Sequence, residues 1–139
     1  MRVGDSPPYI EAAYALQGPL PAGRWGVVGD GIIAGDMANA ITVRFEVRWR
    51  PKGTAGASDQ VVVSVENEFL RDPNNRFNAV AFDTTLNGQA VAAAAGDLLV
   101  LRATAVRGDA GAIYIINGDG STTKGRIPRI DLPPLPQSQ

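Results

Sequence analysis

The chain has 139 residues, the length of a single domain with one core. Its 13 basic and 14 acidic residues give a net charge of −1, so no overall field draws it to nucleic acid or to an anionic membrane surface. The chain contains neither cysteine nor histidine, which excludes disulfides, thiolate metal sites and Ser-His-Asp or Cys-His catalysis. We therefore expect no catalytic residues, no metal site, no cofactor and no nucleic-acid partner.

The predicted elements are short strands separated by turns. Residues 9–17 and 24–33 are the first two candidates, with Pro19 and Pro21 between them. Ala40–Arg50 is the clearest strand, because apolar residues alternate there with polar ones. The apolar set is Ile41, Val43, Phe45, Val47 and Trp49. A loop over 51–58 and a strand over 60–69 complete a predicted antiparallel hairpin.

The second half of the chain continues the pattern. Residues 71–75 (RDPNN) form a predicted turn and 76–84 a strand. Asn87-Gly88 has the residues of a two-residue hairpin turn, after which 89–95 is expected to return antiparallel. The predicted elements after that are a central strand over 97–106, a turn over 107–111 and a β-branched strand over 112–117.

Some eight short strands with glycine, proline and asparagine turns indicate an all-β fold, an antiparallel β-sandwich of jelly-roll topology, with an immunoglobulin-like sandwich as the rival. We expect an N-terminal arm over 1–8, the sandwich over 9–125 and a proline-rich C-terminal arm over 126–139. Strand alternation predicts that six side chains are buried: Phe45, Val47, Val63, Leu99, Leu101 and Ile115.

A Gly-Asp turn opens an apolar strand at 96–102 (GDLLVLR). Over Gly96–Asn117 the chain resembles jelly-roll modules of the C1q/TNF-like kind and of phage decoration or appendage proteins. The resemblance implies a non-enzymatic homo-oligomer, with a trimer favoured, and assigns no functional residue.

Several motifs have a functional and a structural interpretation. Arg107-Gly108-Asp109 spells an adhesion tripeptide, but Gly-Asp is also common turn chemistry. Residues 117–121 (NGDGS) resemble the start of a calcium loop, but its twelfth position is Pro128, so a glycine-rich turn is favoured. Four charged residues share the outer face of one strand and either bind phosphate groups or form cross-strand ion pairs. They are Arg44, Glu46, Arg48 and Arg50.

The C-terminal arm suggests an assembly function. Its apolar residues are spaced among prolines, as in an extended segment that docks into a groove: Ile127, Ile130, Leu132 and Leu135. Docking on a neighbouring subunit is favoured over packing along the arm's own sandwich.

We therefore predict a non-enzymatic structural protein, a homo-oligomeric decoration or appendage subunit. The alternative is a carbohydrate- or ligand-binding module, which requires exposed coplanar aromatic residues among Tyr9, Tyr14, Trp25, Trp49 and Tyr114. A carboxylate-based enzyme comes third. The start of the chain lacks the apolar run of a secretion signal, and no stretch approaches the roughly 20 apolar residues that a membrane span needs. No membrane partner is expected, and the location, virion or extracellular, stays open.

Overall fold

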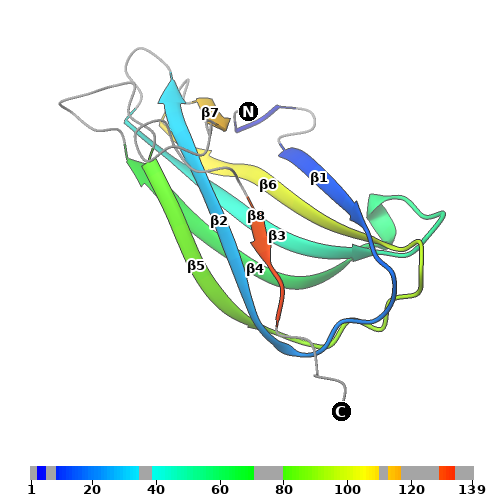
Figure 1. The fold of residues 1–139 in the computed structure, drawn as a ribbon. Helices are drawn as coiled ribbons and strands as arrows, with labels where there is room; N and C mark the ends of the chain where they lie inside the picture. The colour runs from blue at the N-terminus through cyan, green and yellow to red at the C-terminus, as the bar shows by residue number, and fades with distance from the viewer. Residues whose placement is uncertain are drawn as a thin grey trace.

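A computed structural model of the protein describes residues 3–5, 9–34, 39–70, 80–109, 113–116 and 129–133. Its first sheet has four antiparallel strands in the order β1-β6-β3-β4. These are β1 (Tyr9–Ala15), β6 (Leu98–Gly108), β3 (Ala40–Arg50) and β4 (Gln60–Leu70). A short 3-10 turn, η1 (Gly56–Ser58), lies between β3 and β4. In Figure 1 this sheet lies behind β2 and β5.

The second sheet is built around one long strand. β2 (Gly23–Ala34) pairs along one edge with β5 (Val80–Gly88). Its other edge pairs with β8 (Arg129–Asp131) and, further along, with β7 (Ile113–Ile116). All these pairings are antiparallel, and the chain passes repeatedly from one sheet to the other. The all-β prediction is therefore confirmed, with two antiparallel sheets in place.

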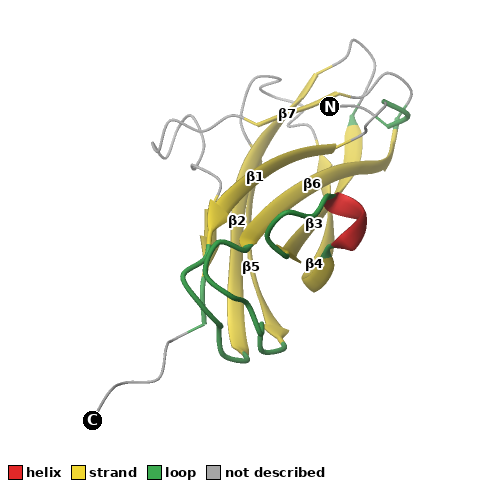
Figure 2. Cartoon of the chain, turned by 90° about the vertical axis from the view of Figure 1, so that its right-hand side faces the viewer, coloured by secondary structure: helices red, strands yellow, loops and turns green. Residues whose placement is uncertain are grey.

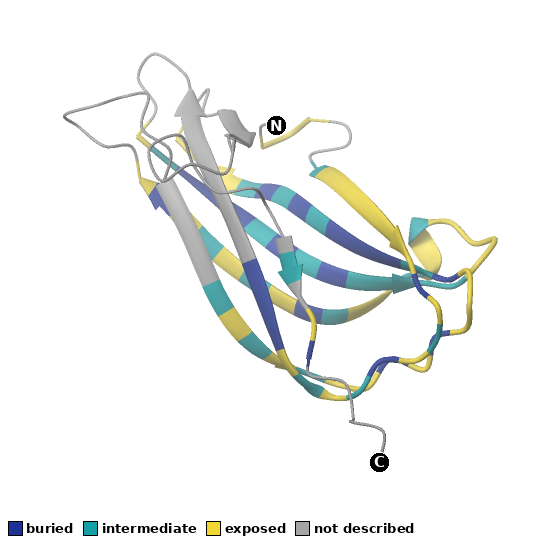
Figure 3. Ribbon diagram, viewed as in Figure 1, coloured by how far each residue is buried: buried dark blue, intermediate teal, exposed yellow. Residues whose placement is uncertain are grey.

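One hydrophobic core lies between the sheets. Trp25 and Val27 of β2 belong to the same buried cluster as residues of β3, β4 and β6. Phe45 and Phe69 contact each other edge to face, with ring centroids 6.1 Å apart. The predicted burial of Phe45, Val47, Val63, Leu99 and Leu101 is confirmed, because the alternation along each strand puts them on the inner face (Figure 3). The side chain of Ile115 lies outside the described residues.

The β3–β4 hairpin was predicted correctly, and β3 has the predicted bounds. The predicted turn at Asn87-Gly88 is wrong, because β5 continues through both residues and pairs them with Arg24 and Gly23 of β2. The returning strand over 89–95 is also wrong. That segment is irregular and makes one bridge, between Val91 and Leu20, as the chain crosses towards β6. Residues 71–75 lie outside the described part.

The C-terminal segment contributes to the chain's own second sheet. Arg129–Asp131 pairs with Gly26–Val28 of β2, and Ile130 packs against the core. The segment 129–131 therefore packs along its own sandwich, which is the alternative to docking on a neighbouring subunit. Leu132 follows β8 and is exposed, whereas Ile127 and Leu135 lie outside the described residues. Figure 2 shows both sheets from the side.

Candidate functional site

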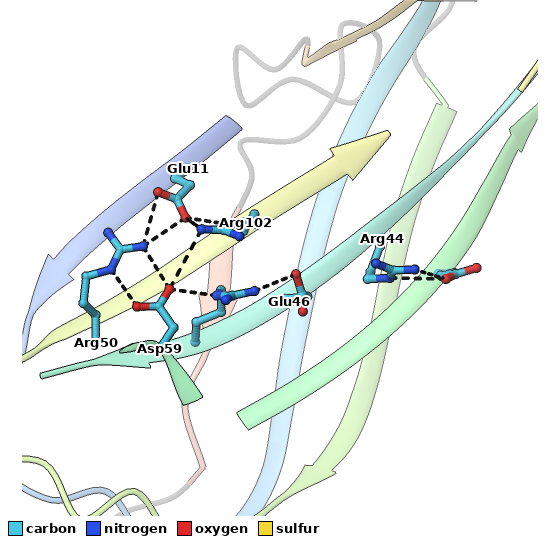
Figure 4. Close-up of polar contacts among 8 residues, drawn as sticks. Glu11, Arg44, Glu46, Arg50, Asp59 and Arg102 are labelled. Carbon is cyan, nitrogen blue, oxygen red and sulfur yellow. Dashed lines mark hydrogen bonds and ion pairs between the residues drawn. The ribbon is translucent and has the colours of Figure 1, made fainter. Parts of the chain in front are cut away.

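The charged stripe of β3 lies on the outer face of the first sheet, as predicted, and its members are paired. Arg44 donates two hydrogen bonds to Glu66, its direct cross-strand partner on β4. Arg48 bonds to Glu46 at 3.0 Å and to Asp59 at 2.8 Å. Arg50 forms two hydrogen bonds with Asp59, at 2.7 and 2.9 Å. The ion-pair interpretation of this stripe is therefore the correct one (Figure 4).

Asp59 is the centre of this network. It follows η1 directly, so the loop after β3 folds back over the sheet and places its carboxylate between Arg48 and Arg50. The Asp59 side chain has no exposed surface. A Cβ atom added at Gly56 would lie 3.1 Å from the Nη2 atom of Arg50 and 3.1 Å from the Nη2 atom of Arg102. The loop backbone therefore packs directly against these two guanidinium groups. The loop thus covers the arginine side chains on the outer face of the sheet.

Glu11 joins the edge strand to the same network. Arg102 of β6 donates to the Glu11 carboxylate at 2.6 Å, and Arg50 donates to it at 3.2 Å. The Arg102 guanidinium also stacks over the Tyr9 ring, 3.9 Å from its centroid. Residues from β1, β3, β6 and the loop are therefore held by one set of contacts.

The hydrogen bonds between Asp59 and its arginine partners favour the ionised forms of these groups. Burial by itself would raise the pKa of Asp59, but the hydrogen bonds from Arg50 and Arg48 outweigh it and hold the pKa below its usual value. The hydrogen bond to Asp59 likewise raises the pKa of Arg50. Three arginines, Arg48, Arg50 and Arg102, face three carboxylates, those of Glu11, Glu46 and Asp59. Because these charges balance, the network has no excess positive charge with which to bind a phosphate group. Its contacts with Asp59 hold the loop against the sheet.

Asp97 explains the Gly-Asp turn before β6. Gly96 has a positive φ of 94°, and the buried Asp97 carboxylate accepts three hydrogen bonds. The donors are the backbone N–H groups of Lys52 and Ala94 and the Trp49 indole, all within 2.9 Å. The two backbone bonds are the main cause of the lowered pKa of Asp97. This motif ties two loops together at one end of the first sheet.

The adhesion-like tripeptide is engaged within the chain. Arg107 and Gly108 are the last residues of β6, so the predicted turn over 107–111 is wrong at its first two positions, and residues 110 and 111 lie outside the described part. Arg107 donates to Glu66 at 2.9 Å. The Asp109 carboxylate accepts from the backbone N–H groups of Asn39 and Ala40, at 2.8 and 3.1 Å. Both charged side chains therefore have structural partners. Residues 117–121 lie outside the described part.

An apolar groove lies between the edge of the first sheet and the C-terminal segment. Its volume is about 300 Å³, and it is lined by Tyr14, Ala15, Leu16, Leu99, Ile130 and Leu132. Tyr14 is 50% exposed and Leu132 is 46% exposed. Sequence reasoning had named Ile130 and Leu132 as assembly residues but had not connected them with Tyr14. Only the pairing of β8 with β2 brings the two ends of the chain to one groove.

The described aromatic residues share no stacking face. Trp25 is fully buried, and Trp49 is partly buried and bonded to Asp97. Tyr9 and Tyr14 are five positions apart on β1, so they point to opposite faces of the strand. The side chain of Tyr114 lies outside the described part. This arrangement does not provide the coplanar platform that the carbohydrate-binding alternative requires.

Within the described ranges, no three potential metal ligands lie close enough to hold an ion. The same part of the structure has no helix with the length and apolarity needed to cross a membrane. Comparison of the chain with protein-family models, curated protein sequences and solved structures found no match in any of the three.

Proposed function

We propose that this protein is a non-enzymatic structural subunit that assembles with further copies of itself, on a jelly-roll framework of the decoration or appendage kind. The observation that carries the proposal is the apolar groove beside β1, with Tyr14 and Leu132 both exposed at its rim. Association becomes more favourable when a partner buries large apolar side chains that are gathered at one groove, because their surface is removed from water.

The polar chemistry of the described residues supports the same proposal. The arginines and carboxylates of the outer face are used in fastening a loop to the sheet, in pairs whose charges balance. Ion pairs that fix a loop to a sheet make the domain more rigid, which is a property expected of a structural subunit. The apolar groove is therefore the feature that is best suited to contact another molecule.

Light scattering of the purified protein after gel filtration tests the proposal. We expect the wild-type mass to be a multiple of the 14.6 kDa chain and to fall towards one chain on dilution. Leu132→Ser is expected to weaken the association, because it removes an apolar side chain from the rim of the groove.

Leu70→Ser is the matched control, since Leu70 is also exposed but lies at the end of β4, on the opposite edge of the sheet. It should leave the mass unchanged. A wild-type protein that remains a single chain at every concentration would contradict the proposed function.

A further inference from the structure

Among the described strands the first sheet ends at β1, and large inner-face side chains of this strand are partly exposed. Ile10, Ala12 and Tyr14 lie directly opposite Ala103, Leu101 and Leu99 of β6, so all six share the inner face. The three β6 residues are buried, whereas Ile10 is 41% exposed and Tyr14 is half exposed. An apolar strip of the inner face is therefore left open to solvent.

The outer edge of β1 is also available for pairing. Among the described residues, β1 pairs with β6 alone, so the backbone groups along its other edge have no strand partner there. Edge strands are usually protected by charged residues, prolines or bulges. The only charged residue of β1 is Glu11, and Arg50 and Arg102 already neutralise it on the outer face.

The opposite edge of the same sheet is protected. β4 has the charged Glu68 among its outer-face residues, and its pairing with β3 contains a register shift at Val47/Arg48. These are features that discourage the addition of another strand. The contrast singles out β1 as the edge suited to association.

The sequence of β1 is complementary to itself in the antiparallel direction. If Ala12 faces Ala12 of a second copy, all seven residues pair, and Ile10 lies opposite Tyr14 of that copy. An aromatic residue opposite a β-branched one is a favourable cross-strand pair. Glu11 then faces Ala13, so the two Glu11 carboxylates do not lie directly opposite each other. Pro7 and Pro8 precede the strand and cannot donate hydrogen bonds, which limits the pairing to Tyr9–Ala15.

We propose that two copies of this chain associate edge to edge through β1, about a two-fold axis at Ala12, so that their first sheets become one continuous sheet. The inference rests on the proposed function, because it names the contact by which the subunits assemble. The partner's Tyr14 packs beside Ile10 across the new pairing, and its Ile10 beside Tyr14, so each of these exposed side chains loses part of its contact with water. A two-fold contact produces an even number of subunits, in place of the trimer that the sequence resemblance favoured.

Cysteine cross-linking tests this register, because the natural chain has no cysteine to interfere. In Ala12→Cys the two thiols face each other, and mild oxidation should give a covalent dimer. In Ala13→Cys each thiol faces Glu11 of the other copy on the opposite face of the sheet. We expect Ala12→Cys to cross-link at least roughly tenfold faster, since a disulfide needs Cβ atoms about 4 Å apart. Equal rates in an oligomeric protein would overturn the β1 contact and leave the proposed function intact.

A second pair of variants tests the edge without cysteine. Ile10→Lys places a charge on the proposed interface and should halve the mass in solution. Val61→Lys introduces the same charge on the far edge strand β4, where the native side chain is 49% exposed, and should not change it. Circular dichroism verifies that both variants fold. A wild-type mass of an odd number of chains, or an Ile10→Lys mass equal to that of wild type, would contradict the two-fold contact, whereas a monomeric wild type would refute the proposed function as well.

Discussion

Gly88 is required for close packing in the core and not for a turn, although the pair Asn87-Gly88 favours a tight turn. A Cβ atom at this position would lie 2.6 Å from the indole of Trp25 and 2.9 Å from Val63. Trp25 has no exposed surface and cannot move aside without disturbing the core. The absence of a side chain at Gly88 is therefore a packing requirement, and the residue allows β5 to lie close beneath the ring.

Gly88→Ala is accordingly expected to lower the free energy of unfolding by about 1–3 kcal/mol, the usual cost of overpacking a core. Urea denaturation followed by tryptophan fluorescence measures this change. The control is Gly18→Ala, because no atom lies within 4 Å of the Cβ position at Gly18. If both variants lost the same stability, close packing of the indole would not be the reason for the glycine.

At the scale of elements, the loop between β3 and β4 is held by charge and not by apolar contacts. None of the three residues of η1 is buried. The loop is instead fixed through Asp59, which bonds to arginines of β3, and through Gly56, which rests on two guanidinium groups. A loop of this kind should become less stable when its carboxylate is neutralised.

Asp59→Asn is expected to lower the free energy of unfolding at neutral pH by about 2–4 kcal/mol, because it removes the buried carboxylate that Arg48 and Arg50 share and leaves each of them a single carboxylate partner. The lowered pKa of Asp59 predicts the pH dependence. Its carboxylate contributes its full stability above the ordinary pKa of 3.8, and the contribution is lost as the pH falls through the lower folded pKa. The difference between wild type and Asp59→Asn should therefore shrink below about pH 4.

Thermal unfolding between pH 2 and pH 7 measures this effect. Glu66→Gln provides the comparison, because Glu66 lies on the same sheet face and its pKa is also lowered, through hydrogen bonds from Arg44 and Arg107. Its carboxylate is partly exposed, so the loss of stability should be smaller. A difference between wild type and Asp59→Asn that stays constant across this pH range would show that the carboxylate of Asp59 does not stabilise the loop through its charge.

At the scale of the whole molecule, a single core joins the two sheets. Phe45 of β3 and Phe69 of β4 contact each other in the same cluster that contains Trp25 and Val27 of β2. Neither sheet has an apolar face that it could bury without the other. The two sheets should therefore unfold together, in one transition.

Phe45→Ala is expected to cost about 3–5 kcal/mol, since it removes a buried ring and leaves a cavity between the sheets. Calorimetry and near-ultraviolet circular dichroism, both at one fixed protein concentration, should give coincident transitions for wild type and variant. Two separate transitions in the variant would mean that the sheets are stable independently and that the core is divided.

The local pattern of the sequence determined much of this architecture. The alternation in Ala40–Arg50 predicted the bounds of β3, its buried face and the outer position of its charged stripe. This was possible because the side-chain period of a strand is a property of consecutive residues. The same reasoning recognised β1, β2, β4 and β6 to within a few residues at their ends.

Only the tertiary structure decided which strands are neighbours and which charges meet. Asn87-Gly88 has the local preference for a tight turn, yet pairing with β2, more than sixty positions earlier in the chain, keeps both residues extended. Glu11 lies 91 positions from Arg102, and no local pattern connects them. The groove likewise unites Tyr14 with Leu132 because β8 joins the sheet beside β2. Alternation specifies the face on which a side chain lies, whereas its partners across the sheet depend on how distant segments share one core.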